Sequence, residues 1–304
     1  MLATIVINWR KLIRRLNWRN WFVELDREQP ALAVLAGYTR SGTTYLGRML
    51  SNLTGARPIH EPLNPKEVGE VAFFSERESS SLIENSERHQ KALRLLFSPD
   101  FAGCKYTNNG NKLVYRQRLY KLVRANHYIG YISDLLPATP FVVIIRNPCA
   151  CISSRIRAGW PVPDHSQSIG DIAPLLSKEQ LDLYYNAENI VERLAVSWCL
   201  DNFMLLKNVQ NARFLYVSYE SLVQNPLREF SRILEHIGRS GDLQRLEREL
   251  ELESGGESAV SYLDKWKDSL GPRDIERVKA TLRVFQLDVY YDVDAGMPTA
   301  DFPT

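Results

Sequence analysis

The sequence predicts an α/β protein in which a central parallel sheet carries helices on both faces, a three-layer α/β/α arrangement. Three short apolar runs, at residues 31–36, 141–145 and 214–217, are typical of strands that are buried on both sides. Segments with helical periodicity separate these runs, as expected where helices connect parallel strands. The chain has 304 residues, 44% of them hydrophobic, so it is long enough to bury a substantial core.

The first element is a predicted amphipathic helix. Apolar residues recur at helical spacing between Leu2 and Leu16, and five basic residues lie between Arg10 and Arg19, before the first acid at Glu24. Such a helix either lies on a membrane or a partner, with contact through residues 1–25, or packs on the protein's own core. The charge follows the apolar run, unlike in a signal peptide, and no run reaches the length of a membrane span. We therefore expect a cytoplasmic protein, with or without peripheral membrane contact.

The remaining elements follow in order along the chain. The run at 31–36 ends at Gly37, and helical periodicity from Thr43 to Leu53 ends before Gly55 and Pro58. Residues 66–99 are polar and serine-rich and predict a helical insertion over one face. Further expectations are a short strand at 101–105, a loop at 160–174, and helices at 115–136, 178–211, 226–237, 243–252 and 272–285. We divide the chain into a helix and linker (1–30), one domain (31–290) and a tail (291–304).

Charge and cysteine content argue against several classes of protein. A net charge of +2 gives no reason to expect a nucleic-acid partner. The four cysteines, Cys104, Cys149, Cys151 and Cys199, lack the spacing of a zinc site and are too few for a disulfide scaffold in a chain of this length. They are read as buried thiols in a reducing compartment.

A phosphate-binding loop follows the first predicted strand. Residues 37–44 read G-Y-T-R-S-G-T-T, and a helix begins directly after them. Backbone N–H groups at a helix N-terminus favour an anion, and the two glycines allow a tight turn. A triphosphate-binding loop has lysine where this chain has Thr43, and here the cation is Arg40 inside the loop. No apolar run ends in an aspartate suited to magnesium, so we expect an anion site without a metal.

A second anion site is predicted at the end of the strand at 141–145. Arg146 follows this strand directly, and Ser154 lies in the helix that begins near Pro148. The two side chains reach one anion only if that helix folds back along the strand end; otherwise Arg146 and Ser154 are ordinary surface residues. Arg155 and Arg157 are either solvated or face an acidic substrate.

These two motifs carry a resemblance to a known family. Residues 39–47, T-R-S-G-T-T-Y-L-G, resemble the 5′-phosphosulfate loop of sulfotransferases that use 3′-phosphoadenosine 5′-phosphosulfate (PAPS). Arg40 and Gly47 resemble the carbohydrate O-sulfotransferase branch more than the cytosolic branch, which usually has lysine at the position of Arg40. Arg146-Asn147-Pro148 with Ser154 resembles the family's 3′-phosphate site. Two weaker likenesses, at 214–226 and at 262–270 with Lys265, extend the resemblance over about residues 31–285.

The resemblance implies a P-loop sulfotransferase fold and the transfer of a sulfuryl group from PAPS, without a metal, to a hydroxyl on a carbohydrate or other small molecule. It assigns the donor to a set of residues that all match the family's motifs: Thr39, Arg40, Ser41, Gly42, Thr43, Thr44, Tyr45, Arg146, Ser154 and Lys265. Sulfuryl transfer, like phosphoryl transfer, depends on positioning and charge stabilisation. Arg40 is expected to stabilise the charge that develops on the oxygen of the leaving nucleotide.

The acceptor hydroxyl needs a base. Glu61 is the first choice, because Glu61-Pro62 follows the first helix as a catalytic Glu-Pro does in carbohydrate members of the family. Otherwise Glu61 belongs to a polar turn, and His60, then His165, are the next choices. Lys105 is assigned to the sulfuryl group by analogy with a family lysine near a strand end.

Three other functions stay open at this point: a P-loop nucleotide kinase-like enzyme, a non-catalytic nucleotide-binding module and a membrane-peripheral scaffold. The insertion at 66–99 and the loop at 160–174 are expected to shape the acceptor pocket, but no pattern in them identifies the acceptor. The preference for a carbohydrate depends on family likeness alone, and the sequence leaves the oligomeric state open.

Overall fold

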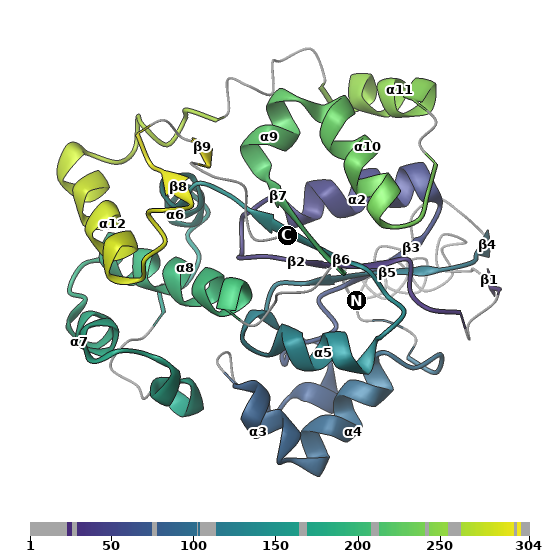
Figure 1. The fold of residues 1–304 in the computed structure, drawn as a ribbon, viewed down its shortest axis with the longest axis horizontal. Helices are drawn as coiled ribbons and strands as arrows, with labels where there is room; N and C mark the ends of the chain where they lie inside the picture. Colours follow the sequence, from purple (N-terminus) through teal and green to yellow (C-terminus); the bar gives the residue numbers. More distant parts are fainter. Residues whose placement is uncertain are drawn as a thin grey trace, which may run out of the picture.

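A five-stranded parallel sheet forms the centre of the protein in the computed structural model (Figure 1). The structure describes residues 23–25, 29–74, 78–101, 103, 114–163, 169–207, 213–240, 243–254, 263–294 and 297–298. The strands are β2 (Ala33–Ala36), β3 (Arg57–His60), β5 (Arg118–Leu122), β6 (Phe141–Ile145) and β7 (Phe214–Ser218), in the order β3-β5-β2-β6-β7. All neighbouring strands pair in parallel, which confirms the predicted parallel sheet.

Two short pairs of strands lie outside this sheet. β1 (Val23–Glu24) pairs in parallel with β4 (Val114–Tyr115), and β8 (Tyr291–Asp292) pairs antiparallel with β9 (Met297–Pro298). Tyr291 and Val293 are buried in the main core, so the packing of the domain reaches past residue 290. The division of the chain into three parts otherwise stays a prediction.

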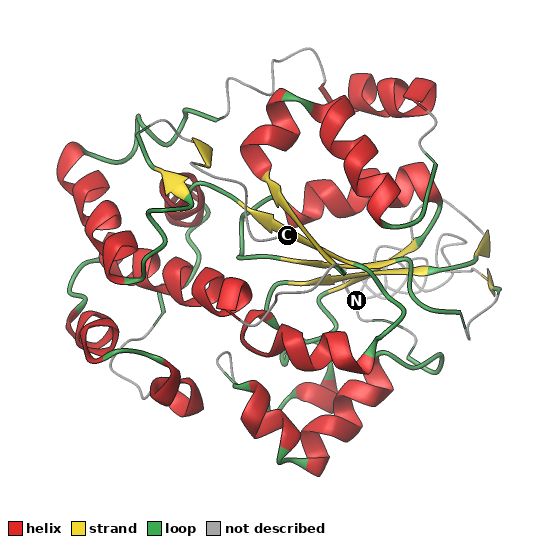
Figure 2. Cartoon of the chain, in the orientation of Figure 1, coloured by secondary structure: helices red, strands yellow, loops and turns green. Residues whose placement is uncertain are grey.

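Helices cover both faces of the sheet, as Figure 2 shows in red around the yellow strands. One face carries α2 (Thr43–Thr54), α9 (Tyr219–Gln224), α10 (Pro226–His236) and α11 (Leu243–Ser254). The core on the other face takes side chains from η2 (Gly69–Val71), α3 (Ser80–Glu84), α4 (Glu87–Leu96), η3 (Asn126–Tyr128), α5 (Ile129–Leu135), α6 (Pro148–Arg157), η4 (Gly170–Leu175), α7 (Lys178–Asn186), α8 (Ile190–Lys207) and α12 (Pro272–Val284). This three-layer arrangement confirms the predicted fold class.

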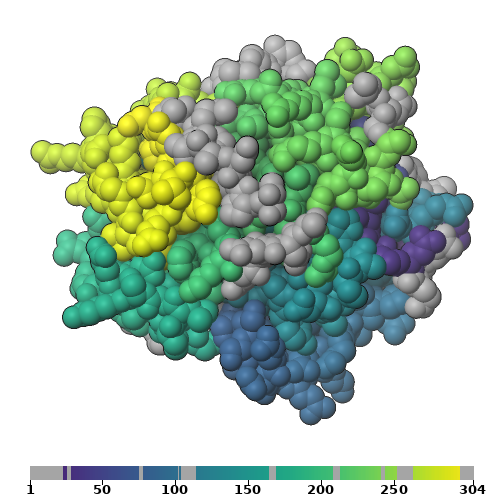
Figure 3. All heavy atoms as spheres, viewed as in Figure 1, coloured from purple at the N-terminus to yellow at the C-terminus, as the bar shows by residue number. Residues whose placement is uncertain are grey.

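Alternate strand residues supply the two cores. Leu35 and Val142 pack with α2 and α10 on one side, whereas Val34 and Val143 pack on the other. Such alternation is what a strand that is buried on both faces requires. Figure 3 shows the resulting surface, on which α3 and α4 form the blue lower part and the segment with α12 and β8 forms the yellow part.

The prediction of a helix over residues 115–136 was wrong. The segment contains β5, the short helix η3 and α5, and β5 is an interior strand of the sheet. Arg118 and Lys121 make this strand hard to recognise from the sequence, because charged residues are rarely buried. Here Glu24 pairs with Arg118 and Glu61 pairs with Lys121, so distant parts of the chain make their burial tolerable.

Two smaller differences concern individual elements. β3 was not predicted; its Pro58 is tolerated because β3 is an edge strand. The predicted helix at 178–211 is divided into α7 and α8.

The predicted N-terminal helix and most of the strand at 101–105 lie outside the described residues. Among the described residues, no helix has both the length and the apolar character that a membrane span requires.

Candidate functional site

The candidate site lies at the carboxyl end of β2, where the sheet has its topological switch point. From β2 the chain leads through α2 to β3 on one side, and the later strand β6 pairs on the other side of β2. Ligands of open α/β sheets bind at such positions, beyond the carboxyl ends of the strands. The loop from Gly37 to Gly42 joins β2 to α2 at this place.

At both loop glycines the backbone leaves no room for a side chain. Gly37 has φ 154° and Gly42 has φ 98°, where a side chain is strained. A Cβ on Gly37 would lie 2.4 Å from the Ile144 carbonyl oxygen, and one on Gly42 would lie 2.4 Å from the Tyr219 ring. No side chain among the described residues caps α2, and its first turn has no acid. The first N–H groups of α2 are therefore suited to an anion.

Arg40, Arg146 and Ser154 meet at this loop. The Nε of Arg40 donates to the Oγ of Ser154 at 2.9 Å, and Nη1 of Arg146 donates to the Arg40 carbonyl oxygen at 3.1 Å. Ser154 of α6 thus reaches the same loop residue that Arg146 contacts, and a shared anion site stays a prediction. The Asn147 side chain caps α6 by accepting from the Ala150 N–H, and Pro148 lies in its first turn, so the helix begins directly after the strand.

Two aromatic neighbours position Arg146. Its guanidinium carbon lies 4.2 Å from the centroid of the Tyr219 ring, and the Trp198 indole N–H donates to its carbonyl oxygen at 3.2 Å. Its Nε is buried and has no hydrogen-bond partner among the described residues. A buried donor without a partner is costly, so this group is poised for an anionic ligand.

The sequence left the role of Arg155 open, and in the structure its side chain binds the loop. Its Nη1 donates to the Tyr38 hydroxyl at 2.7 Å and to Oγ1 of Thr39 at 3.5 Å, and its Nη2 donates to the Pro161 carbonyl at 2.9 Å. Burial raises the pKa of Tyr38 to about 12, so this hydroxyl is neutral at physiological pH. Arg155 therefore joins the loop before α2 to the segment after α6.

Most of the other predicted donor residues belong to this loop or to the first turn of α2. Ser41 is fully buried, with its Oγ 3.8 Å from the Cys151 Sγ, and Thr43 is also buried, whereas Thr44 is exposed and Tyr45 packs on Phe230 from α10. Lys265 lies in a segment that a 2.6 Å hydrogen bond between the hydroxyls of Ser153 and Ser269 fastens to α6. The predicted donor residues thus come from the β2–α2 loop, α6 and the segment before α12.

Glu61 lies in a strained backbone position with φ 48°. Its carboxylate accepts from the Lys121 Nζ at 3.0 Å and from the Arg124 Nη1 at 3.0 Å. Of the non-glycine residues described, only Arg40, Glu61 and Gln286 have positive φ, so two of the three are predicted site residues. Strain of this kind costs about 1–3 kcal/mol and concentrates at functional sites.

His60 precedes Glu61 at the end of β3. Burial and the nearby charge of Lys121 lower the pKa of His60 to about 4. Its imidazole is therefore neutral near pH 7, which agrees with the expectation for a base, but it binds a proton only weakly.

Lys121 is a functional candidate that the sequence analysis missed. It lies near the carboxyl end of β5 and contacts Glu61. The sequence resemblance implies that a lysine at such a strand end acts on the sulfuryl group, but assigns that role to Lys105. The only local signal is the apolar content of Leu119, Tyr120 and Leu122, which does not separate a strand from a helix. Lys105 and His165 lie outside the described residues.

A buried polar cluster supports the start of the loop and was also missed. The Asn126 side-chain amide donates to the Gly37 carbonyl oxygen at 3.4 Å and to the Asp201 carboxylate at 3.0 Å. His127, which is 1% exposed, lies 3.3 Å from the same carboxylate. Among the described residues, no group of three His, Cys, Asp or Glu side chains is placed to hold a metal ion.

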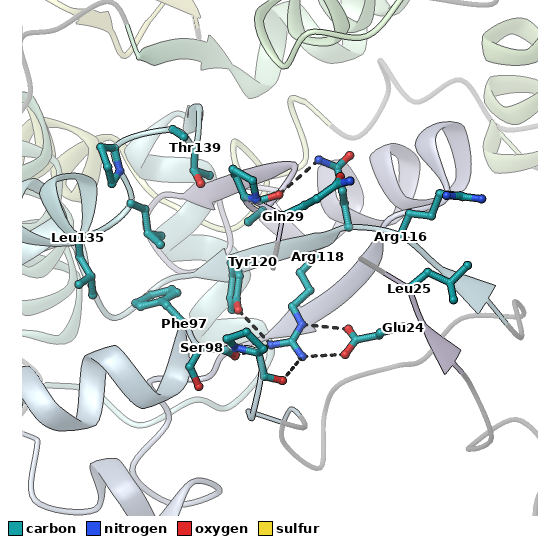
Figure 4. A pocket seen from close by; sticks show the side chains of 17 residues that line it. Glu24, Leu25, Gln29, Phe97, Ser98, Arg116, Arg118, Tyr120, Leu135 and Thr139 are labelled. Atoms are coloured by element: carbon teal, nitrogen blue, oxygen red, sulfur yellow. Dashed lines mark hydrogen bonds and ion pairs between the residues drawn. The ribbon is translucent and has the colours of Figure 1, made fainter. Parts of the chain in front are cut away.

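A separate pocket of about 240 Å³ lies at the opposite end of the sheet (Figure 4). Its walls include Phe97, Leu135 and Arg118, the last at the start of β5. The Arg118 guanidinium is bound by the Glu24 carboxylate and by the carbonyls of Ser98 and Pro99. This pocket is thus remote from the loop between β2 and α2.

The parallel sheet and the glycine-bounded turn have the architecture of α/β proteins that hold an anionic ligand at a helix N-terminus. Within that class the family is defined by sequence: residues 33–242, more than half of the chain, match the model of the Sulfotransferase family. This protein belongs to the sulfotransferase family.

Individual relatives are distant. The chain is 25% identical over 215 residues to nodulation protein NoeE of Sinorhizobium fredii (strain NBRC 101917 / NGR234), covering 69% of this chain and 50% of NoeE. It thus spans about half the length of this curated relative. Among solved structures, mouse sulfotransferase SULT7A1 complexed with PAP is 12% identical, with 92% of this chain and 90% of that chain covered and a TM-score of 0.48. The sulfotransferase domain of the Synechococcus PCC 7002 olefin synthase is 17% identical, with 89% and 99% covered and a TM-score of 0.45.

Proposed function

We propose that this protein transfers the sulfuryl group of PAPS to a hydroxyl group of a carbohydrate. The observation that carries the proposal is the meeting of Arg40, Arg146 and Ser154 beside the open N-terminus of α2. A nucleotide with phosphate groups at both the 3′ and the 5′ positions needs two anion sites of this kind at one edge of a sheet. Membership of the sulfotransferase family supports the same donor.

The residues present fit such a donor. In the proposal, the first N–H groups of α2 and the Arg40 guanidinium bind the 5′ end, and Arg146 with Ser154 binds the 3′-phosphate. The buried Nε of Arg146 supports this assignment, because an anion would supply the partner it lacks among the described residues. When bound, the donor supplies an activated sulfuryl group. Arg40 then stabilises the negative charge that develops on the departing oxygen as the bond from the acceptor oxygen to sulfur forms.

Glu61 is the proposed base for the acceptor hydroxyl. Its strained backbone position supports a functional role, and Lys121 and Arg124 hold its carboxylate in place. Lys121, near the carboxyl end of β5, donates to this carboxylate and is suited to neutralise the charge of a sulfuryl oxygen. His60 is the second choice, because Glu61-Pro62, and not His60, matches the catalytic Glu-Pro of the carbohydrate members.

One residue of the loop and one of α2 support the carbohydrate acceptor. Arg40 replaces the lysine of the cytosolic branch, and Gly47 follows at the position seen in the carbohydrate branch, as the sequence resemblance implies. Gly47 is buried against Leu35, where a Cβ would lie 3.3 Å from that side chain, so Gly47 also has a packing reason. The acceptor assignment therefore depends mainly on Arg40.

Calorimetric titration with adenosine 3′,5′-bisphosphate (PAP), compared with ATP and magnesium, tests the donor site. We expect PAP to bind without metal at micromolar or lower concentration and ATP to bind weakly. The Arg40→Ala variant should bind PAP about 10- to 100-fold more weakly, because it loses hydrogen bonds to charged groups. Arg157→Ala, at an exposed position of the same helix as Ser154, is the matched control and should bind like the wild type.

Two results would overturn the proposal. A preference for ATP with magnesium would indicate a kinase-like enzyme instead. Unchanged PAP binding by Arg40→Ala would show that the nucleotide does not bind at the loop between β2 and α2.

A further inference from the structure

Trp160 is an exposed tryptophan beside the candidate site. Its side chain is 44% exposed, whereas Trp198 and Trp266 are 2% and 3% exposed. Tryptophan carries a large apolar surface that proteins usually bury. An indole that the fold leaves open to solvent next to a reactive loop is therefore available to bind a ligand.

The exposed indole lies against Arg40. The guanidinium carbon of Arg40 is 5.4 Å from the centroid of the Trp160 ring, within the range of a cation–π contact. Arg40 is also the residue proposed to stabilise the charge on the oxygen that links the nucleotide to the sulfur. A ring in contact with it thus lies beside the place where donor and acceptor must meet.

The backbone around Trp160 is held in position. The Trp160 N–H donates to the Arg155 carbonyl oxygen at 3.2 Å, and the Arg155 side chain donates to the carbonyl of the next residue, Pro161, at 2.9 Å. The same guanidinium donates to the Tyr38 hydroxyl in the donor loop at 2.7 Å. The ring is therefore placed relative to the donor loop before any ligand arrives, which lowers the entropy cost of binding.

We propose that Trp160 is the platform on which a pyranose ring of the acceptor stacks. A pyranose has an apolar face of C–H groups and an edge of hydroxyls. Stacking of that face on the indole presents the hydroxyl edge to the neighbouring Arg40. This inference rests on the proposed function and adds to it the residue that selects a ring-shaped acceptor.

Ligand-observed NMR on the PAP-saturated protein tests the platform with two probes. Cellotetraose has pyranose rings, whereas sorbitol has hydroxyl groups but no ring. The wild type should bind cellotetraose and not sorbitol. The Trp160→Ala variant should bind cellotetraose about tenfold more weakly, and Trp160→Phe should retain most of the affinity, since it keeps an aromatic face. Leu227→Ala, which removes an apolar side chain of similar exposure (40%) on α10, is the control and should have no effect.

PAP affinity, measured on each variant, separates the outcomes. In the proposal it stays within about twofold of the wild type in Trp160→Ala. Loss of PAP affinity in that variant would mean that the indole stacks on the adenine of the donor, and the platform for the acceptor would be wrong. Absence of cellotetraose binding to a wild-type protein that binds PAP would also overturn the platform but leave the donor site intact. Failure of the wild type to bind PAP would instead overturn the proposed function.

Discussion

At the scale of single residues, two charged residues have unfavourable backbone conformations. Arg40 has φ 70° and Glu61 has φ 48°. Each is secured by its surroundings: the Arg40 carbonyl accepts from Arg146, and the Glu61 N–H donates to the Lys121 carbonyl at 3.0 Å. Strain that the surrounding structure maintains in this way is a mark of a functional site.

Glu61→Gln tests the base at this scale. The change keeps the shape of the side chain but removes the group that accepts the proton, so kcat should fall by about 100-fold or more. PAP affinity should stay unchanged, because Glu61 lies outside the assigned donor residues. Transfer from radiolabelled PAPS to a mixture of neutral oligosaccharides, with calorimetry for PAP, measures both.

His60→Gln is the matched control for this test. The pKa of His60 is about 4, so the imidazole stays neutral between about pH 5 and pH 8 and should add no ionisation to the pH–rate profile in that range. Loss of turnover in His60→Gln, with Glu61→Gln fully active, would reverse the assignment of the base.

At the scale of elements, the site depends on three junctions that meet at one edge of the sheet. The loop from β2 to α2, the turn from β6 to α6 and the helix η3 after β5 come from distant parts of the chain. Helix α8 connects them, because Trp198 binds the Arg146 carbonyl and Asp201 binds Asn126, which in turn binds the Gly37 carbonyl. Such shared support explains how a loop can hold a fixed geometry.

Gly42→Ala tests the junction between β2 and α2. The new Cβ would lie 2.4 Å from the Tyr219 ring, against which the Arg146 guanidinium packs. The ring must move, so we expect PAP affinity to fall by about tenfold and stability to fall by about 1–3 kcal/mol. Calorimetry and urea unfolding measure the two effects.

Gly238→Ala is the control for the backbone cost alone. Gly238 also has a positive φ, of 68°, but a Cβ there would meet nothing within 4 Å. It should lose stability and bind PAP normally. Normal PAP binding by Gly42→Ala as well would contradict the assigned role of this loop.

At the scale of the whole molecule, Glu24 connects the start of the described chain to the sheet. Its carboxylate lies 2.7 Å from Nη2 of Arg118 in β5 (Figure 4) and 2.9 Å from Nη1 of Arg57 in β3, and its side chain is only 5% exposed. Burial by itself would raise the pKa of Glu24, but hydrogen bonds from Arg118 and Arg57 outweigh burial and lower the pKa below its ordinary value of 4.5. A lowered carboxyl pKa means that the pairing stabilises the folded state above that ordinary value and is lost as the pH falls through the folded-state value.

Glu24→Gln should therefore destabilise the protein by about 3–5 kcal/mol near pH 7, because it leaves two buried guanidinium groups without their carboxylate. The difference from the wild type should shrink below about pH 4.5, where the wild-type carboxyl begins to be protonated. Urea unfolding at several pH values measures both. Glu276→Gln removes an exposed partner of Lys279 and should change stability by less than about 1 kcal/mol. Equal effects of the two variants would show that the Glu24 pairing contributes little.

The sequence by itself determined the features that local patterns encode. The apolar runs at β2, β6 and β7 predicted parallel strands, because a strand buried on both faces must be apolar throughout. The residues of the loop between β2 and α2 predicted an anion-binding turn, since its glycines and the following helix are neighbours in the chain.

Only the tertiary structure decided the features that depend on distant partners. β5 could not be predicted, because Glu24 and Glu61, which make its charged residues tolerable, lie far away in the sequence. The contact of Arg155 with the loop between β2 and α2 and the contact of Trp160 with Arg40 likewise depend on where the fold places α6 and the residues after it. The physical reason is the same in each case: the burial of a charged group, or the exposure of an aromatic ring, is set by side chains that the fold brings together and that no local pattern contains.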